Sequence, residues 1–218
     1  MLVKDCMTRH PIMISPETPA AEAQKIMAEN QIRHLPVIGG GKRLVGLITR
    51  QRLALKPDEL GSLNIWEISR RLSDLTAQRI MLPANQVHSI SPSRTIERAA
   101  ATMTDHKIGC LPVIEEDVVV GIITETDLLI SFQIMLGLPA EGVRVTVRMP
   151  EGVGIFKQVI VAFSDKGWPI MGLGSFPTRK RPGYWDSVFK RAGGSIEEVR
   201  AAISDVPDQE IVDIREVA

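Results

Sequence analysis

Two polar residues three positions apart, Thr124 and Asp127, have side chains that suit a sugar and a phosphate. Residues at this spacing share one face of a helix, so both would lie on its first turn. The carboxylate could accept hydrogen bonds from two ribose hydroxyls, while the threonine hydroxyl and the free amides of the helix N-terminus suit a phosphate. The same residues could instead only cap and solvate the helix start. The spacing alone leaves the two interpretations equal.

A similar pair occurs earlier in the chain, where Thr49 is followed three residues later by Arg52. Arginine has no acceptor, so it cannot bind ribose hydroxyls as a carboxylate does. It could hold a phosphate instead. We therefore expect one competent site of this kind, at Asp127, rather than two.

Both pairs belong to an internal repeat, and a duplicated segment of this length indicates two copies of one folded module. The matching segments keep their order along the chain and nearly the same spacing. They are Leu35–Ile38 with Leu111–Ile114, Ser15-Pro16 with Ser91-Pro92, and Gly46–Thr49 with Gly121–Thr124.

The residue pattern of each copy predicts the same elements. They are a short strand, a helix, two strands joined by a tight turn, and a second helix beginning at the threonine. In the first copy these are a strand over 12–14, a helix over 19–30, strands over 35–38 and 44–48, and a helix from Thr49. In the second they are a strand over 87–90, a helix over 95–106, strands over 111–114 and 118–123, and a helix from Thr124. Apolar residues at helical spacing between Ser62 and Leu75 predict an amphipathic connecting helix.

The repeated motifs resemble the cystathionine-β-synthase (CBS) domain. They are Met7, Ser15-Pro16, Ile32–Val37 and Gly46–Thr49 in the first copy, and Gly121–Leu128 at the end of the second. The resemblance implies a compact pair that binds AMP, ADP, ATP or S-adenosylmethionine in the cleft between the copies. It also implies a homodimer and no required cofactor. The whole chain is similar to acetoin-utilisation regulatory proteins, in which a CBS pair precedes an ACT domain.

The resemblance also suggests further site residues. Arg33 and His34 precede the first Leu-Pro-Val strand, where related domains often place residues that contact phosphate, so they could form a cationic rim. They could equally be two exposed residues at a strand entrance. Ile90, Pro112 and Ile122 could line a slot for the base or could be plain core residues.

The C-terminal third changes pattern after Gly137-Leu138-Pro139, which predicts a linker. It predicts strands over 143–149, 169–176, 184–190 and 211–217, a helix around 155–163, and a second helix opened by a capping box at Ser195–Glu198. This βαββαβ order is ferredoxin-like. Together with the turn at Gly154 it resembles an ACT domain, which implies an amino-acid site near Glu151–Gly154.

We therefore predict an α/β (α+β) fold. Its parts are a first CBS domain (1–60), a connecting helix (61–76), a second CBS domain (77–136), a linker (137–142) and an ACT-like domain (143–218). We expect a non-catalytic protein that senses an adenine nucleotide or adenosyl ligand and signals to the ACT domain or to a regulated partner protein. A ligand-free scaffold and an amino-acid sensor are the alternatives.

Composition narrows the function classes. Lys plus Arg and Asp plus Glu are both 26, which gives no general electrostatic reason for binding nucleic acid or an anionic membrane. The two cysteines and four histidines show no disulfide framework and no metal-ligand spacing. Neither a signal peptide nor an apolar run of the ~20 residues that span a bilayer is evident, so we expect the cytoplasm.

Overall fold

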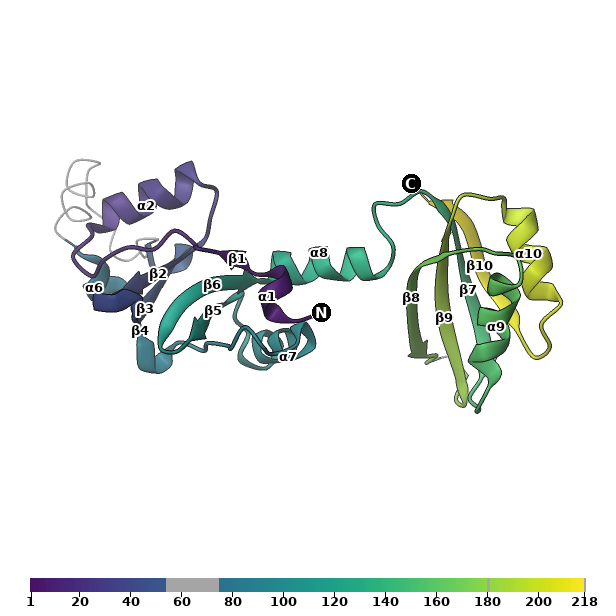
Figure 1. The fold of residues 1–218 in the computed structure, drawn as a ribbon. Helices are drawn as coiled ribbons and strands as arrows, with labels where there is room; N and C mark the ends of the chain where they lie inside the picture. The colour runs from purple at the N-terminus through teal and green to yellow at the C-terminus, as the bar shows by residue number, and fades with distance from the viewer. Residues whose placement is uncertain (54–74, 180, 218) are drawn as a thin grey trace, which may run out of the picture. The chain divides into compact units, whose positions relative to one another are not determined.

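The computed structural model describes residues 1–53, 75–179 and 181–217. It divides into two compact units, Met1–Leu128 and Leu129–Ala218 (Figure 1). Most of the predicted connecting helix, including Ser62 and Trp66, lies outside the described residues. In the part of the chain that is described, no helix is long and apolar enough to cross a membrane.

The first copy of the repeat contains α2 (Ala20–Glu29), β2 (His34–Ile38), β3 (Leu44–Thr49) and α3 (Arg50–Leu53). A short 3₁₀ helix, η1 (Gly40–Lys42), joins β2 to β3. Helix α2 presents its small and flexible side chains to the core, since Ala20, Ala23 and Met27 are its buried residues. These elements confirm the helix predicted over 19–30 and the strands predicted over 35–38 and 44–48.

The second copy repeats the arrangement with α7 (Ile96–His106), β5 (Cys110–Glu115), β6 (Val118–Thr124) and α8 (Glu125–Met135). The hydroxyl of Thr95 caps α7 by accepting a hydrogen bond from Arg98 N at 3.3 Å. The turn between β5 and β6 places Glu116 and Asp117 at φ of 48° and 66°. Two consecutive positive φ values are typical of the tight hairpin turns that match strand twist.

The strands predicted over 12–14 and 87–90 are reduced to single parallel bridges. Ile14 bridges Val37, and Ile90 bridges Val113. Pro16 and Pro92 follow two residues later, and proline has no amide hydrogen with which to extend a ladder. Each copy therefore uses this segment for one pair of contacts before its helix begins.

Each copy also receives a short segment from the region that precedes the other copy. Near the N-terminus, α1 (Val3–Cys6) leads into β1 (Thr8–Arg9), which pairs antiparallel with β6 of the second copy. The equivalent α6 (Ala77–Ile80) leads into β4 (Leu82–Pro83), which pairs with β3 of the first copy. Another 3₁₀ helix, η2 (Ala84–Gln86), follows β4. The sequence pattern does not predict this exchange.

The exchanged segments contribute to the cores. Val3 is fully buried in the core of the second copy, and Ala77 is fully buried in that of the first. A smaller apolar cluster joins the two copies and consists of Leu47, Cys110, Ile122 and the half-buried Val87. The two copies therefore share both backbone pairing and an apolar contact.

The second unit has the predicted βαββαβ order. Its elements are β7 (Gly142–Pro150), α9 (Ile155–Ser164), β8 (Ile170–Pro177), β9 (Tyr184–Ala192), α10 (Ile196–Ser204) and β10 (Glu210–Val217). The four strands are antiparallel in the order β10-β7-β9-β8. Both helices cover one face of this sheet (Figure 1), where Phe163 and Val199 pack against Phe189 in the core. The capping box at Ser195 and Glu198 is confirmed.

Candidate functional site

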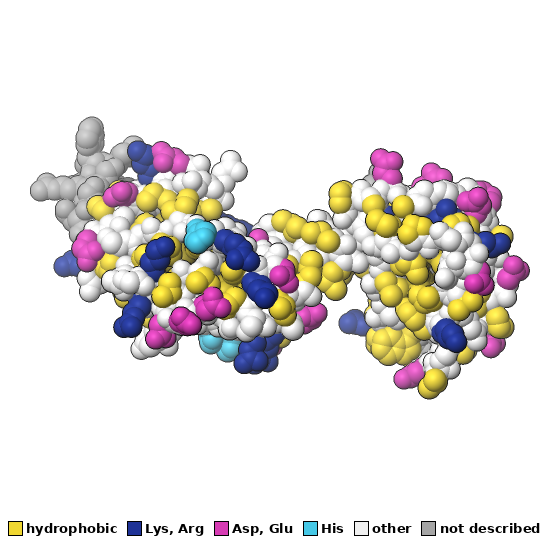
Figure 2. Space-filling model, in the orientation of Figure 1, with side chains coloured by type: hydrophobic (Ala, Val, Ile, Leu, Met, Phe, Trp, Pro, Cys, Tyr) yellow, Lys and Arg dark blue, Asp and Glu magenta, His cyan; other side chains and the backbone are white. Residues whose placement is uncertain are grey.

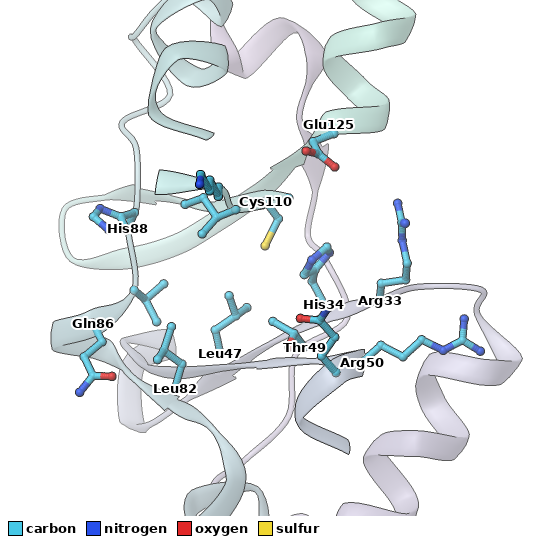
Figure 3. A pocket seen from close by; sticks show the side chains of 15 residues that line it. Arg33, His34, Leu47, Thr49, Arg50, Leu82, Gln86, His88, Cys110 and Glu125 are labelled. Atoms are coloured by element: carbon cyan, nitrogen blue, oxygen red, sulfur yellow. The ribbon is translucent and has the colours of Figure 1, made fainter. Parts of the chain in front are cut away.

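A cavity of about 700 Å³ lies between the two copies of the repeat, within the first unit. Equivalent positions of both copies line it, so the cavity lies where the repeats face each other (Figure 3). The lining residues are Arg33, His34, Leu47, Thr49, Arg50, Gln51, Leu82, Gln86, Val87, His88, Lys107, Ile108, Gly109, Cys110 and Glu125. A cavity of this volume is in the range of small-molecule sites in proteins.

Apolar side chains form the middle of the cavity. Leu47 comes from β3, Leu82 from β4, and Val87 from the segment that follows η2. Cys110 closes this part from the start of β5, and its burial raises the pKa of the thiol to about 12, with a smaller contribution from the carboxylate of Glu125. The thiol is therefore neutral and acts as a small apolar group.

One end of the cavity is charged. Figure 3 shows Glu125 above His34, with Arg33 and Arg50 on the same side of the view. A Cβ on Gly109 would lie 3.3 Å from Glu125 Oε2 and 3.6 Å from His34 Nε2, so the two side chains converge beside this glycine. Burial lowers the pKa of His34, and the charge of Arg33 lowers it further, whereas Glu125 opposes the shift.

Backbone hydrogen bonds fix this end in the same way in both copies. Arg50 N donates to Arg33 O at 2.9 Å, and the equivalent Glu125 N donates to Gly109 O at 3.2 Å. Each bond ties the first residue of a helix to the loop before the neighbouring strand. The repeat thus places Arg50 and Glu125, which have opposite charges, at equivalent positions around one cavity.

The other end of the cavity carries Gln86 and His88, which lie on the opposite side of the view in Figure 3. The ring of His88 stacks on that of His106, with 3.7 Å between the ring centroids. The side-chain amide and the imidazole at this end can both take part in hydrogen bonds with a ligand.

The structure places Thr124 and Asp127 in a capping arrangement. Asp127 Oδ2 accepts hydrogen bonds from Thr124 N and Thr124 Oγ1, both at 2.7 Å. Asp127 N donates to Thr124 Oγ1 at 3.4 Å. Neither residue belongs to the set that lines the cavity. Ribose binding by Asp127 stays a prediction.

The other predicted site residues divide into two groups. Arg33, His34 and Thr49 line the cavity, and the cationic rim expected of Arg33 and His34 stays a prediction. Arg52 is not among the lining residues, and its guanidinium donates to Ile80 O at 3.4 Å. The remaining three, Ile90, Pro112 and Ile122, are buried and are not among the lining residues either.

Several lining residues had no signal in the sequence. Leu82 and Gln86 reach the first copy because the segment around β4 is exchanged, which the repeat alone does not show. Lys107 lies at the C-terminus of α7 with a φ of 54°. Glu125 could have been found, because it occupies the position equivalent to Arg50 at the start of the second helix.

No group of three or more histidine, cysteine, aspartate or glutamate side chains suited to a metal ion gathers in residues 1–53, 75–179 and 181–217. Basic, acidic and apolar side chains are interspersed on the faces of both units that Figure 2 shows, in keeping with a formal net charge of zero. The charged end of the cavity is therefore a local feature and not part of a generally basic surface.

Solved structures with this fold include CBS-domain proteins in complex with adenosyl ligands. A Vibrio cholerae protein assigned to acetoin utilization (AcuB) is 32% identical, with 61% of this chain and 90% of that chain covered and a TM-score of 0.50. The CBS pair of MJ0100, in complex with 5′-methylthioadenosine and S-adenosyl-L-methionine, is 27% identical, with 61% and 99% covered and a TM-score of 0.50. CBSX2 in complex with AMP is 25% identical, with 60% and 95% covered and a TM-score of 0.50.

Sequence relatives include enzymes that are much longer than the matched region. Homoserine O-acetyltransferase of Methanocorpusculum labreanum is 28% identical over 132 residues, which cover 60% of this chain but only 24% of that protein. The family model for the CBS domain matches residues 3–57 and 77–133, one match for each copy of the repeat. These matches cover half of the chain and agree with the paired folds described above, and so the chain belongs to the CBS-domain family.

Proposed function

We propose that the CBS pair is a non-catalytic regulatory module that binds an adenine nucleotide or adenosyl ligand in the cavity between its two copies. The complexes of MJ0100 with adenosyl compounds and of CBSX2 with AMP support this class of ligand. The apolar middle suits a base, and the polar ends suit a ribose and its substituents.

The observation that carries the proposal is the shared lining of the cavity. A ligand that touches His34 and Arg50 from one copy and Cys110 and Glu125 from the other contacts both at once. Such a ligand favours whichever arrangement of the copies gives it the better contacts, and this differential affinity is what regulation requires. The signal would pass to the C-terminal domain or to a regulated partner protein.

Titration calorimetry with AMP, ADP, ATP, S-adenosylmethionine and 5′-methylthioadenosine tests the proposal. Gly109→Val should abolish binding, because the added side chain would occupy the space beside Glu125 and His34. Gly40→Ala is the control, since no atom lies within 4 Å of an added Cβ there. Asp127→Ala tests the ribose site predicted at Thr124 and Asp127.

The outcomes separate the alternatives. Loss of binding in Gly109→Val but not in Asp127→Ala places the ligand in the cavity, and the reverse places it beside Asp127. If no compound binds or raises the melting temperature, the adenosyl proposal is wrong, because a specific ligand must stabilise the folded state. The chain would then fit the ligand-free scaffold. Sedimentation equilibrium would test the homodimer, which stays a prediction.

An amino-acid sensor of the ACT type is a second candidate, favoured by the strand order of the second unit. A groove of about 680 Å³ between α9 and α10 includes Gly154, at the predicted amino-acid site, together with Lys157 and Asp205. Thermal shifts on addition of single amino acids, but not of nucleotides, would support this role.

A further inference from the structure

One lysine of the second unit is buried without a partner. Lys190 lies on β9 and is 2% exposed, and within the described residues its Nζ has no hydrogen-bond partner. Successive residues of a strand point to opposite faces of a sheet. Since Phe189 belongs to the core between the sheet and its two helices, Lys190 lies on the face away from α9 and α10 (Figure 1). A buried ammonium without an acceptor destabilises the arrangement that buries it.

The neighbouring charges do not compensate for this burial. Arg144 lies directly opposite Lys190 in the β7–β9 pair, and like charges at facing positions of two strands are unfavourable. The carboxylate of Asp213 accepts a hydrogen bond from Arg144 Nη1 at 3.1 Å and also pairs with Arg215. In the described part of the chain, no acid forms an ion pair with Lys190.

A short segment directly after α8 covers this lysine. The segment consists of Leu136 and Gly137, and we call it the strap. A Cβ on Gly137 would lie 3.0 Å from Lys190 Cδ. The strap also packs on β8, because a Cβ on Gly172 would lie 2.5 Å from Gly137 N, and a Cβ on Gly174 would lie 3.2 Å from Leu136 Cδ2. Gly172 is the β8 residue opposite Lys190, so the strap lies over both strands at this point.

Backbone hydrogen bonds attach the strap to α8. The amides of Leu136, Gly137 and Leu138 donate to carbonyl oxygens near the C-terminal end of α8 at 2.9–3.1 Å. Gly137 has a φ of 85°, which is typical of the residue that ends a helix. The contacts of the strap with Gly172, Gly174 and Lys190 are packing contacts. The strap can therefore leave the sheet while its hydrogen bonds to α8 stay intact.

We propose that the strap is a conformational switch with two states. In the docked state it covers Lys190, and in the released state the ammonium of Lys190 reaches water. Docking gains the packing on two glycines of β8 but buries an ammonium that has no acceptor, whereas release loses the packing and hydrates the charge. These opposing contributions bring the two states close in free energy, and Lys190 sets the balance between them. The switch belongs to the second unit and does not depend on a ligand in the cavity.

Acetylation of lysines in the native full chain tests the switch. The chain is treated with sulfo-N-hydroxysuccinimide acetate at a series of urea concentrations below the unfolding transition, and the modified lysines are identified by peptide mass mapping. Lys157 and Lys166 are exposed and serve as internal references. Lys190 should react more slowly than either, at a rate that hardly changes with urea, because release of the strap exposes far less surface than unfolding does.

Two glycines of β8 offer a matched pair of variants. Gly172→Ala should raise the acetylation rate of Lys190 about tenfold or more, because the new Cβ meets the backbone of the strap. Gly174→Ala is the control, since its Cβ meets only the flexible end of Leu136 and should change the rate less than about threefold. Leu136→Ala removes the contact with Gly174 and should also raise the rate. It keeps the test decisive if Gly172→Ala fails to fold.

Lys190→Met separates the effect of the ammonium from that of the strap. Methionine is apolar and of similar length, so this substitution should raise the midpoint of urea unfolding in the otherwise wild-type chain. In the Gly172→Ala background the strap is released and the side chain at position 190 is hydrated. The gain in the midpoint should therefore be lost there, which a double-mutant cycle would measure.

The results either support the switch or overturn it. A urea-independent acetylation rate that increases in Gly172→Ala but not in Gly174→Ala supports it. If Lys190 reacts as fast as Lys157 and Lys166, the strap does not cover it. If the rate follows global unfolding at every urea concentration, the strap does not lift by itself. If Lys190→Met lowers the midpoint equally in both backgrounds, the ammonium does not oppose docking, and the proposal is wrong.

Discussion

Gly46 lies so close to Leu82 that a Cβ on the glycine would lie 2.8 Å from the carbonyl oxygen of the leucine. Met81 adds a side-chain contact at the same point. The internal repeat reproduces this relationship at Gly121, where an added Cβ would lie 3.0 Å from Thr8 O and 2.5 Å from Met7 Sδ. In both copies a glycine makes room for the exchanged segment, since its strand must approach β3 or β6 to pair with it.

We expect Gly46→Ala and Gly121→Ala each to lower the free energy of unfolding by about 1–3 kcal/mol, because a backbone oxygen cannot move aside as a flexible side chain can. Gly40→Ala, which meets no atom within 4 Å, should change it by less than about 0.5 kcal/mol. Urea unfolding measures all three variants. Wild-type stability of Gly46→Ala would mean that the exchanged segment packs less closely than described.

The two cysteines should differ in reactivity. Cys110 is buried and its thiol has a pKa of about 12, so almost no thiolate is present at pH 8. Cys6 is only half-buried. Iodoacetamide at pH 8 should therefore modify Cys6 in the native chain, and Cys110 only after denaturation, as peptide mass mapping would show. Rapid native labelling of Cys110 would indicate that the cavity opens to solvent.

The half-buried His34 predicts a pH dependence of stability. Because its pKa in the folded state is lowered below 6.5, the unfolded chain takes up the proton first as the pH falls. Its contribution to stability is therefore complete above pH 6.5 and declines as the pH falls below that value towards the folded-state pKa. Urea unfolding at pH 7.5 and 5.5 should show a smaller difference for His34→Asn than for the wild type.

Titration of the His34 ring by NMR tests the cause of this shift. Glu125 opposes the shift, so Glu125→Gln should lower the pKa of His34 further. An unchanged or higher pKa in this variant would show that the two side chains do not interact as their convergence beside Gly109 suggests.

The capping box of α10 should stabilise the second unit. Ser195 Oγ accepts a hydrogen bond from Glu198 N at 3.2 Å, and Glu198 Oε2 accepts one from Ser195 N at 3.1 Å. Ser195→Ala should lower the free energy of unfolding by about 1 kcal/mol. Ser204→Ala in the same helix removes only an exposed bond to Arg200 O and should change it by less than about 0.5 kcal/mol, as urea unfolding would show.

The sequence predicted best what depends on local pattern. The helices from Ala20 and Ile96, the hairpins around Gly40 and Glu116, and the capping box at Ser195 all follow from periodicity, turn residues or spacing. The repeat also indicated two copies of one module, and the resemblance to the CBS domain implied a cleft between them.

The sequence could not predict the features that depend on which copy a short segment pairs with. β1 and β4 are each two residues long, too short for periodicity to identify, and their pairing with the other copy is a tertiary choice. This choice brings Leu82 and Gln86 into the cavity. The sequence likewise could not predict the capping arrangement of Thr124 and Asp127, because their spacing suits both a helix cap and a ligand site.

The exchanged segments interlock the two copies of the repeat. A chain cut near residue 75 would leave the first fragment without Ala77 and β4, and the second without Val3 and β1. Neither fragment could complete its own sheet, yet each would carry the piece that the other lacks. We therefore expect the module to unfold as a whole, and each half to refold only in the presence of the other.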